Sequence, residues 1–307
     1  MPSRIAPGGV VHGSLRRPTT RLAGFVALAK LRVVELLLMT TVPTMVLAER
    51  GWPSTWLVII TLIGGTCAAA GANAINMVID RDIDALMPRT QGRPLVTGLI
   101  SPREAMAFAI GLEALAFAVL WAGANLLAAC LALAATLFYV FVYTIWLKRT
   151  SRQNVVIGGA AGAAPVLVGW AAVTDSTSWS AALLFVVIFL WTPPHTWALA
   201  IRHADEYRAA GVPMLPAVET MRGTTRQMTV YTVLLVAATL ALWPVADLGW
   251  IYGVTAVALG VAFIAGTVEL ERRPDPQRAM RVFAFSISYI TLLFGAMTLD
   301  VLVRHGV

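Results

Sequence analysis

The sequence predicts an all-α membrane protein: a bundle of about nine transmembrane helices around a central cavity that opens to the cytoplasmic side. Three observations predict this fold, namely the composition, the length of the apolar runs and the distribution of basic residues. Of the 307 residues, 58% are hydrophobic and 13% are charged, and the mean hydropathy is +0.76. Globular domains carry about 25% charged residues. Because a soluble chain this apolar could not cover its surface with polar groups, we expect lipid to be its solvent.

Apolar runs divide almost the whole chain. A helix of about 20 residues crosses the hydrocarbon core, and we expect spans at residues 33–48, 56–80, 103–121, 126–147, 155–174, 179–201, 228–246, 250–268 and 280–303. A helix satisfies its own backbone hydrogen bonds in lipid, and these runs are about twice as long as the strands of a membrane barrel. The runs therefore favour helices over a barrel.

Basic residues alternate with the spans. All 23 Lys and Arg residues except Arg50 and Arg304 lie in the N-terminal segment, in a connector that follows an even-numbered span, or, for Arg103 and Arg281, at the very start of the span after such a connector. Since cytoplasmic loops carry the excess of Lys and Arg, we expect the N terminus in the cytoplasm, the C terminus outside, and the protein in the cell's inner (plasma) membrane. The net charge of +7 does not indicate nucleic-acid binding, because the charges form no single groove-facing surface.

The polar segments outline the domain organisation. Residues 1–24 are basic, and we expect them to form a disordered N-terminal tail. Residues 25–307 contain no polar stretch long enough to fold alone, so we expect one transmembrane domain. Its two halves resemble a pseudo-repeat, with acidic motifs in the loops 80–102 and 202–227.

The first acidic motif follows the second span. Asn76, Asp80 and Asp84 are spaced i, i+4, i+8, so on a helix they share one face within about 80° and about 12 Å of rise. Asp82 lies about 200° from Asp80 on the same helix, and we expect it to be solvated or ion-paired. A solvated helix end neutralised by arginines is the alternative for the whole motif, because carboxylates near hydrocarbon need partners or a water-filled cavity.

The second motif follows the sixth span and favours a binding site. Asp205 and Glu206 lie on the expected cytoplasmic side, as the first motif does, and repeats of this kind commonly frame a site at their interface. Mg²⁺ is held by one or two carboxylates together with substrate phosphate oxygens. We therefore expect a Mg²⁺ site with ligands from Asp80, Asp84, Asp205 and Glu206.

A magnesium site of this kind needs a phosphorylated ligand. Basic side chains near both motifs could neutralise its phosphates, Arg through bidentate hydrogen bonds and Lys as a point charge. We expect the diphosphate-binding residues to be Asn76, Arg89, Arg93, Lys148 and Arg208. The sequence has no Walker-type phosphate loop, which argues against an ATPase.

The pattern Asn76, Asp80, Asp84 resembles the N-x-x-x-D-x-x-x-D motif of the UbiA-type intramembrane prenyltransferases. Further stretches resemble the branch of that family that farnesylates haem: VVELLLMTTVPTM, DALMPRTQGRPLVTG, YTIWLKRTSRQNVVIGGAAGAAP, WTPPHTWALA and AAGVPMLP. The resemblance covers about residues 30–221. One departure concerns the second motif, often D-x-x-x-D in the family, because Ala209 stands four positions after Asp205.

This resemblance implies a nine-helix bundle with Mg²⁺ and farnesyl diphosphate bound at the two acidic loops. It implies transfer of the farnesyl group to the vinyl group of haem B, a substrate and not a prosthetic group, with addition of water to give haem O and diphosphate. Contact with a haem A synthase that uses the product is a further implied partnership. Catalytic roles fall on Asp80, Asp84 and His195.

His195 lies in WTPPHTW, about two turns before the end of the sixth span. We expect Pro193 and Pro194 to interrupt the helix and to widen the cavity there. The histidine is expected to be associated with haem, either as an iron ligand or in acid–base chemistry, and the sequence leaves both roles open.

An allylic diphosphate that ionises leaves an anion and a carbocation. Mg²⁺ and arginines would stabilise the anion. Aromatic side chains in a water-poor cavity would shield the cation, with candidates Phe138, Tyr139, Tyr143, Trp191 and Trp197.

The fifth span begins at a polar residue. We expect Asn154 to cap this helix, with contact to substrate as the alternative. Gly158, Gly159, Gly162 and Gly169 on the same span are expected to allow close helix packing, with a wall of the cavity as the alternative.

Two other functions compete. Prenyl transfer to a quinone precursor would use the same diphosphate site, but WTPPHTW argues against it. An ion-coupled secondary transporter would also suit a repeated helical bundle, yet its binding site would lie near the bilayer midplane, and these acids lie at the cytoplasmic edge.

Overall fold

The computed structural model describes residues 18–306, with side chains at all of these positions except 31–38. Its elements, in chain order, are α1 (Arg21–Ala29), α2 (Leu31–Glu49), α3 (Thr55–Ile79), α4 (Arg81–Leu86), α5 (Pro102–Gly123), α6 (Leu126–Leu137), the π-helix η1 (Phe138–Leu147), α7 (Lys148–Thr150), α8 (Asn154–Thr174), α9 (Trp179–Arg202), α10 (Ala204–Ala209), α11 (Leu215–Val218), α12 (Met221–Val245), α13 (Trp250–Arg272) and α14 (Pro276–His305).

Eight helical stretches of the described part are long and apolar enough to cross a membrane. They are α3, α5, the continuous stretch α6–η1–α7, α8, α9, α12, α13 and α14, and they correspond to the second through ninth predicted spans. The first predicted span, 33–48, falls on α2, where the side chains of 31–38 lie outside the described residues. The polytopic all-helical fold is therefore confirmed.

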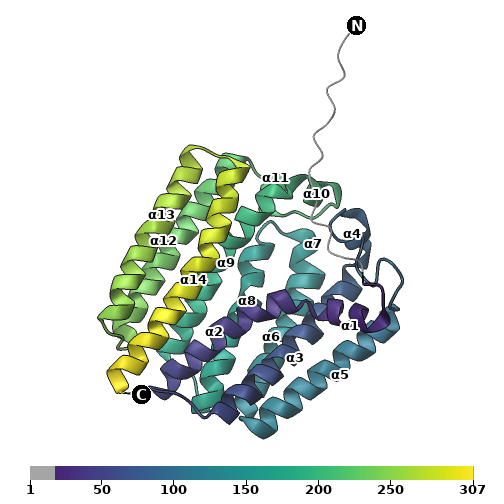
Figure 1. Ribbon diagram of the computed structural model, residues 1–307. Coiled ribbons are helices and arrows are strands. Elements are labelled where there is room, and N and C mark those ends of the chain that lie inside the picture. Colours follow the sequence, from purple (N-terminus) through teal and green to yellow (C-terminus); the bar gives the residue numbers. More distant parts are fainter. Residues whose placement is uncertain (1–17, 307) are drawn as a thin grey trace.

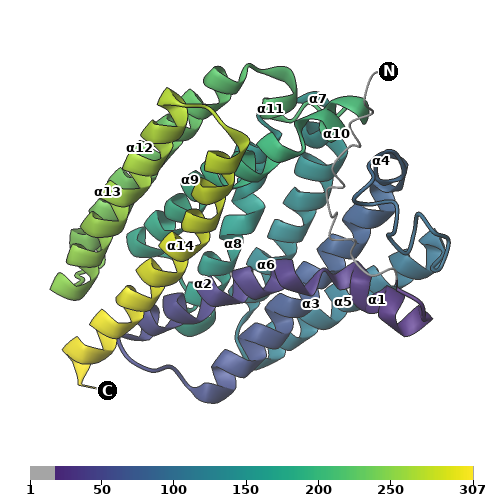
Figure 2. The same ribbon diagram turned by 45° about the horizontal axis from the view of Figure 1, so that its top comes forward.

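The helices stand side by side as an irregular bundle (Figure 1). α12, α13 and α14 lie at one edge and α5 lies at the other, and α2, α8 and α9 lie between them. Figures 1 and 2 both show α4, α7, α10 and α11 at the same end of the bundle. The two loops with the acidic motifs therefore lie at one end, as the repeated pattern predicts.

The two halves of the bundle have different cores. The half built from α8, α9 and α12–α14 buries large side chains, including Tyr252, Phe263 and Tyr289. The core shared by α3, α5, α6 and α8 consists largely of alanines, such as Ala68 and Ala128. Small residues let membrane helices approach closely, and they also leave space where the helices diverge.

Two predicted boundaries are wrong. The expected disordered tail extends to Gly24, but α1 begins at Arg21, where the Thr20 side chain caps the helix by accepting a hydrogen bond from Ala23 N at 3.2 Å; residues 1–17 lie outside the described residues. The seventh span was predicted to begin at residue 228, but α12 begins at Met221. The first turns of this helix are polar, so hydropathy does not reveal them.

The expected interruption of the sixth span does not occur. α9 stays helical through Pro193 and Pro194. The proline rings remove two backbone donors, but the helix is packed between α8, α12 and α14, and neighbouring helices hold such a segment in place.

Candidate active site

The first acidic motif lies at the end of α3 and in α4. Asn76, Asp80 and Asp84 are 3%, 0% and 1% exposed, so the motif is buried and the solvated alternative is wrong. Asn76 Nδ2 donates to Asp80 Oδ2 at 2.7 Å. The predicted shared face of these three residues points into the protein, where an unpaired carboxylate would be costly.

Two cations neutralise these carboxylates. Lys148 pairs with Asp80, and Arg93 pairs with Asp84. A third cation, Arg149, lies 3.8 Å from Asp80 Oδ1. The structure therefore brings two of the predicted diphosphate-binding residues, Lys148 and Arg93, directly to the first motif.

Lys30 is a member of this cluster that the sequence analysis missed. Its Nζ donates to Asn76 Oδ1 at 3.0 Å. Lys30 has left-handed backbone angles, with φ 49°, where the chain passes from α1 to α2. Burial, together with the nearby Arg93 and Lys148, lowers the pKa of Lys30 to about 7. A basic residue before the first span was available as a signal, but membrane orientation already accounted for it.

The π-helix η1 lies against the face of α3 that carries Asn76 and Asp80. Asn76 Nδ2 donates to Thr144 Oγ1 at 3.2 Å, and Thr144 Oγ1 donates to the carbonyl of Tyr139 at 2.9 Å. Lys148 follows directly at the end of η1. π-helical turns are rare and occur frequently at functional sites. Here the π-helix carries Thr144 and Lys148 to the face of α3 that bears Asn76 and Asp80.

The second motif meets the first through Arg89. Arg89 Nε lies 3.5 Å from Glu206 Oε2, and Arg89 Nη2 donates to Tyr207 Oη at 3.1 Å. The guanidinium also lies over the Tyr207 ring, 5.2 Å from its centroid. His203 Nδ1 is 2.9 Å from the other oxygen of Glu206. Arg89 thus joins the loop after α4 to α10.

Asp205 and Arg208 do not face this cluster. The Asp205 side chain is 97% exposed and pairs with Arg208 Nη1 at 2.5 Å. Arg208 Nε donates to the carbonyl of Ala217 at 3.1 Å. Glu206, the adjacent acid, is therefore the residue of the second motif that lies against the first.

The described residues contain no group of three acidic, His or Cys side chains close enough to hold one metal ion. The four predicted ligands of Mg²⁺ are therefore not gathered around one point. Two oxygens nevertheless suit a hard cation, because Asp80 Oδ1 and Glu206 Oε2 are buried and accept no hydrogen bond from the described residues. Mg²⁺ needs only one or two carboxylates when substrate phosphates complete its shell. Asp80, Asp84 and Glu206 fit that role.

Asp82 differs from its two neighbours in the motif. Arg149 Nη1 and Nη2 each donate to one Asp82 oxygen at 2.8 Å, and the Asp82 side chain is 61% exposed. The hydrogen bonds from Arg149 lower the pKa of Asp82 to about 2. The prediction that Asp82 is ion-paired outside the stripe is confirmed.

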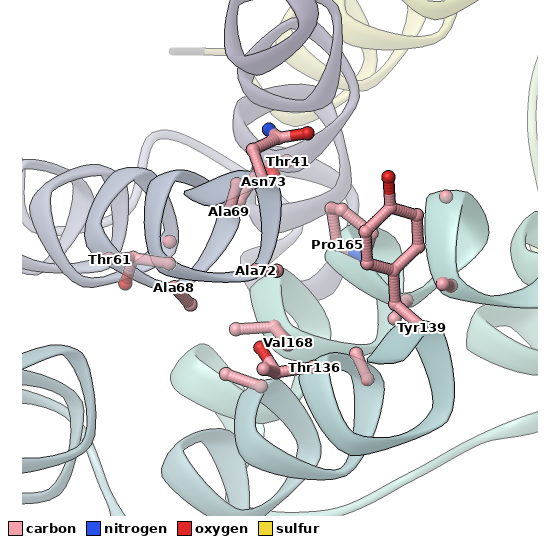
Figure 3. Close-up of a pocket in the computed structure, with 16 residues that line it drawn as sticks. Thr41, Thr61, Ala68, Ala69, Ala72, Asn73, Thr136, Tyr139, Pro165 and Val168 are labelled. Carbon is pink, nitrogen blue, oxygen red and sulfur yellow. The ribbon is translucent and has the colours of Figure 1, made fainter. Parts of the chain in front are cut away.

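A cavity of about 160 Å³ lies between α2, α3, α6, η1 and α8 (Figure 3). Alanines and glycines make up most of its lining, and Thr41, Thr61, Asn73, Thr136 and Tyr139 contribute the polar atoms. Figure 3 shows these side chains around one space, with α3 on one side and Tyr139 on the other.

The cavity continues the face of α3 that carries the acidic motif. Thr61, Gly65, Ala68 and Ala72 line it, and they precede Asp80 at helical intervals of three and four residues. At 1.5 Å per residue, the lining extends from about 12 Å to about 28 Å from Asp80 along the helix axis. The acidic motif and the apolar cavity therefore lie one after the other along the same face of α3.

Only one of the five aromatic candidates lines this cavity. Tyr139 does, and Tyr143 stacks on it with a centroid distance of 5.3 Å. Phe138 is partly buried outside the lining, and Trp191 and Trp197 are buried in α9.

His195 lies on the side of α9 that contacts α14. Its Nδ1 is 2.7 Å from Ser286 Oγ, and its ring stacks between Trp191 and Phe283, at centroid distances of 4.1 and 4.7 Å. The side chain does not line the cavity beside Tyr139, and its contacts are with α9 and α14. The haem-associated role of His195 stays a prediction.

The start of α8 differs from expectation in one respect. Gln153 is the N-cap residue, and no side chain caps the helix, so the capping role of Asn154 is wrong. The Asn154 carboxamide is 0% exposed and has no hydrogen-bond partner among the described residues. Close packing by glycine is confirmed at Gly158, because a Cβ there would lie 2.2 Å from Tyr143 Cδ2.

Comparisons with known proteins agree with this geometry. The UbiA prenyltransferase family matches residues 37–290. The chain is 52% identical over 291 residues to the protoheme IX farnesyltransferase of Parafrankia sp., which covers 94% of this chain and 93% of the relative. It is 51% identical over 286 residues to the protoheme IX farnesyltransferase of Frankia alni, covering 92% of this chain and 99% of the relative.

Solved structures share the fold at low identity. A digeranylgeranylglyceryl phosphate synthase is 18% identical with a TM-score of 0.77, over 92% of this chain and 98% of that chain. A UbiA homologue from Archaeoglobus fulgidus bound to GPP and Mg²⁺ is 20% identical with a TM-score of 0.62, over 89% and 99%. UbiA homologues of this fold thus bind Mg²⁺ with prenyl diphosphates. The chain belongs to the UbiA prenyltransferase family, in its protoheme IX farnesyltransferase branch.

Proposed function

We propose that the chain transfers the farnesyl group of farnesyl diphosphate to a vinyl group of haem B, with addition of water, giving haem O and diphosphate. The observation that carries this proposal is the buried face of Asn76, Asp80 and Asp84, which leads directly into an apolar cavity. The high identity to protoheme IX farnesyltransferases over almost the whole chain supports haem as the acceptor.

The diphosphate is held at the charged end of the site. Asp80 and Asp84, which pair with Lys148 and Arg93, would hold Mg²⁺, and Glu206 would contribute from the second loop. Lys148 and Arg93 are then available to bind phosphate oxygens. Bound Mg²⁺ neutralises the charge that develops on the leaving diphosphate.

Three further residues take supporting roles at this end. Lys30 and Asn76 lie beside the carboxylates and can donate to phosphate oxygens. Arg89 lies between the two loops and can reach the same ligand. Asp205 and Arg208 form an exposed pair, so their predicted contacts with metal and diphosphate require the loop after α9 to turn inward.

The farnesyl chain occupies the cavity between α3, η1 and α8. Its lining of alanine and glycine gives an apolar surface without large side chains. Such a surface excludes water from the allylic cation before the acceptor attacks it. Tyr139, which lines the cavity, and Tyr143, which stacks on it, are the aromatic groups closest to this path.

The proposal also includes the orientation of the chain in the membrane and one protein partner. The Lys and Arg residues at the end that carries both acidic loops support a cytoplasmic position for this end and for the N terminus, with the C terminus on the other side of the plasma membrane. Contact with a haem A synthase, the enzyme that would consume the product, is part of this proposal.

The test is product analysis with purified protein. We expect haem B and farnesyl diphosphate to give a farnesylated hydroxyethyl haem, detected by mass, in the presence of Mg²⁺ and not after chelation. A quinone-precursor aromatic acid offered in parallel should remain unmodified. Modification of the aromatic acid with no change in haem would contradict the proposal.

A further inference from the structure

A second cavity, of about 280 Å³, lies between α13 and α14. α13 lines it with Phe263, Gly266 and Glu269, and α14 lines it with Arg278, Arg281 and Phe285. It shares no lining residue with the cavity beside Tyr139. Because α13 ends and α14 begins at the end of the bundle that carries the acidic loops (Figure 1), this cavity lies near that end.

The lining changes from charged to apolar along both helices. On α14, Phe285 follows Arg281 by four residues and therefore lies on the same face. On α13, Phe263 precedes Glu269 by six residues, with Gly266 between them. At 1.5 Å per residue, the two aromatic side chains lie about 6 to 9 Å further into the bundle than the charged ones. Their rings contact edge to face, with a centroid distance of 5.6 Å, so the cavity has a charged mouth and an aromatic floor.

The protein neutralises only one of the two arginines at this mouth. Arg278 Nε donates to Glu269 Oε1 at 3.3 Å, and Arg278 Nη1 lies 3.8 Å from Asp275 Oδ2. No described residue forms an ion pair or a hydrogen bond with the exposed Arg281 side chain. One positive charge is therefore left over, on a guanidinium whose donors match the oxygens of a phosphate.

The apolar part of the cavity has room for a chain. A Cβ added at Gly266 would meet only Val282 Cγ2, at 4.0 Å. Ala262 and Arg281 line the cavity and are both exposed, so it opens to the outside of the bundle. Ligand pockets measure about 300–1,000 Å³, and a space at the lower end of this range takes a headgroup and the start of one acyl chain, while the remainder stays in the bilayer.

We propose that this cavity binds an anionic glycerophospholipid, with the phosphate on Arg281 and Arg278 and the first part of one acyl chain over Phe263 and Phe285. A lipid with one net negative charge neutralises the charge that Arg281 leaves over, whereas a zwitterionic lipid brings a cation of its own to the two arginines. Basic pockets between transmembrane helices bind anionic headgroups in this way. The proposal requires a membrane but not haem as the acceptor, so it goes beyond the proposed function.

Arg226 provides a matched control for Arg281. It is the sixth residue of α12, as Arg281 is the sixth residue of α14. Both are exposed, and no described residue pairs with the Arg226 side chain. Arg226 does not line the cavity. A general effect of surface charge on lipid binding would appear in both variants, and loss of a lipid contact would appear only at Arg281.

The experiment titrates the delipidated full-length protein with phosphatidylglycerol or phosphatidylcholine of the same acyl chains, with native mass spectrometry as the readout. Wild-type protein should bind a first phosphatidylglycerol more tightly than a first phosphatidylcholine. Arg281→Gln should weaken binding of phosphatidylglycerol about five- to tenfold and remove the preference. Arg281→Lys should keep part of the preference, and Arg226→Gln should match wild type.

A second pair of variants tests the apolar part. Gly266→Leu fills the cavity and should weaken binding of both lipids. Gly295→Leu is its control, because Gly295 is exposed on α14, also has open space around it and lies outside the lining. Hydrogen exchange in nanodiscs locates the site: phosphatidylglycerol should protect residues 269–281 and leave the first turns of α12 unchanged.

Equal binding of phosphatidylglycerol by Arg281→Gln and Arg226→Gln would overturn the proposal, as would equal affinity of wild-type protein for the two lipids. Inorganic phosphate that binds as tightly as phosphatidylglycerol would show an anion site without a lipid. Displacement of the lipid by farnesyl diphosphate would assign the cavity to the substrate, and either result contradicts the proposal. If Arg281→Gln fails to fold, the comparison of Gly266→Leu with Gly295→Leu decides.

Discussion

Lys148 and Asp80 form an ion pair inside the protein, with their side chains 13% and 0% exposed. The pair joins the end of η1 to the end of α3. Breaking a buried pair by removing one partner costs about 3–5 kcal/mol, because the other charge stays buried. We expect Lys148→Met to lower the melting temperature, and Mg²⁺ with diphosphate to restore part of the loss. If Mg²⁺ and diphosphate leave the melting temperature of Lys148→Met unchanged, a shared site for the ion and Lys148 is contradicted.

The three aspartates near the end of α3 should differ sharply in their effects on turnover. Asp80→Ala and Asp84→Ala remove buried oxygens of the charged end, and we expect kcat to fall about 10²- to 10³-fold or more. Asp82→Ala is the matched control, because it removes an exposed carboxylate paired with Arg149. Steady-state rates of haem farnesylation measure the difference. Equal losses in all three variants would show that the motif acts through net charge.

The effect of Asp82→Ala should not depend on pH in the assay range. The pKa of Asp82 is lowered to about 2 by Arg149, below the ordinary value of about 3.9. A carboxylate with a depressed pKa stabilises the fold above its unfolded pKa, and this contribution is lost only as the pH falls toward 2. The difference in unfolding free energy between Asp82→Ala and wild type, measured by chemical denaturation, should therefore be constant between about pH 6 and 8.

Lys30 should couple diphosphate binding to proton uptake. Its pKa of about 7 means that the free site loses a proton as the pH rises through this value, whereas a bound diphosphate favours the charged ammonium. Binding above pH 7 should therefore take up a proton, which calorimetry in two buffers of different ionisation enthalpy measures.

Lys30→Met should abolish this uptake and weaken binding about ten- to a hundredfold, as expected for loss of a charge-assisted hydrogen bond. Arg21→Gln is the control, because Arg21 lies on the same segment and pairs with Glu104 away from the acidic motif. Unchanged proton uptake in Lys30→Met would place the titrating group elsewhere.

The cavity should set the length of the prenyl chain. Gly65 and Gly162 line it, and a Cβ added at either would meet nothing within 4 Å. Gly65→Leu should reduce kcat/KM for farnesyl diphosphate about 10- to 200-fold relative to geranyl diphosphate. Gly111→Leu is the control, because Gly111 also has open space but is exposed on α5 outside the lining. Equal losses for both donors in Gly65→Leu would place the chain elsewhere.

Arg89 should hold the loop after α4 against α10. Arg89→Gln removes the ion pair with Glu206 and the cation–π contact with Tyr207. We expect KM for farnesyl diphosphate to rise and hydrogen exchange to increase in α10, with little change in α3. Arg81→Gln is a suitable control, because its contact is to the carbonyl of Val78. Unchanged exchange in α10 would show that the loops are held together without Arg89.

Much of this molecule could be predicted from sequence because lipid imposes simple rules. Long apolar runs predicted the spans, and the spacing of Asn76, Asp80 and Asp84 predicted that these three side chains share one face, which the structure shows to be buried. Helix ends with polar first turns, such as that of α12 at Met221, leave no signal in hydropathy.

Other features depend on long-range contacts that spacing does not encode. The π-helical stretch at Tyr139 and Thr144, and the approach of Lys30 to Asn76 across 46 positions, arise from packing. The second motif was harder for a similar reason, since the adjacent residues Asp205 and Glu206 point in different directions. The prolines of α9 were misjudged because packed neighbours let the helix continue.

The central claim is that a divalent ion and a prenyl diphosphate meet at the buried face of α3 and α4. The most direct measurement is a structure with Mn²⁺ and a non-hydrolysable farnesyl diphosphate analogue, in which anomalous scattering locates the ion. We expect Mn²⁺ at Asp80 and Asp84, with the diphosphate beside Lys148 and Arg93 and the isoprenoid extending toward Thr61. An ion bound elsewhere, with the isoprenoid outside the cavity between α3 and α8, would contradict the account.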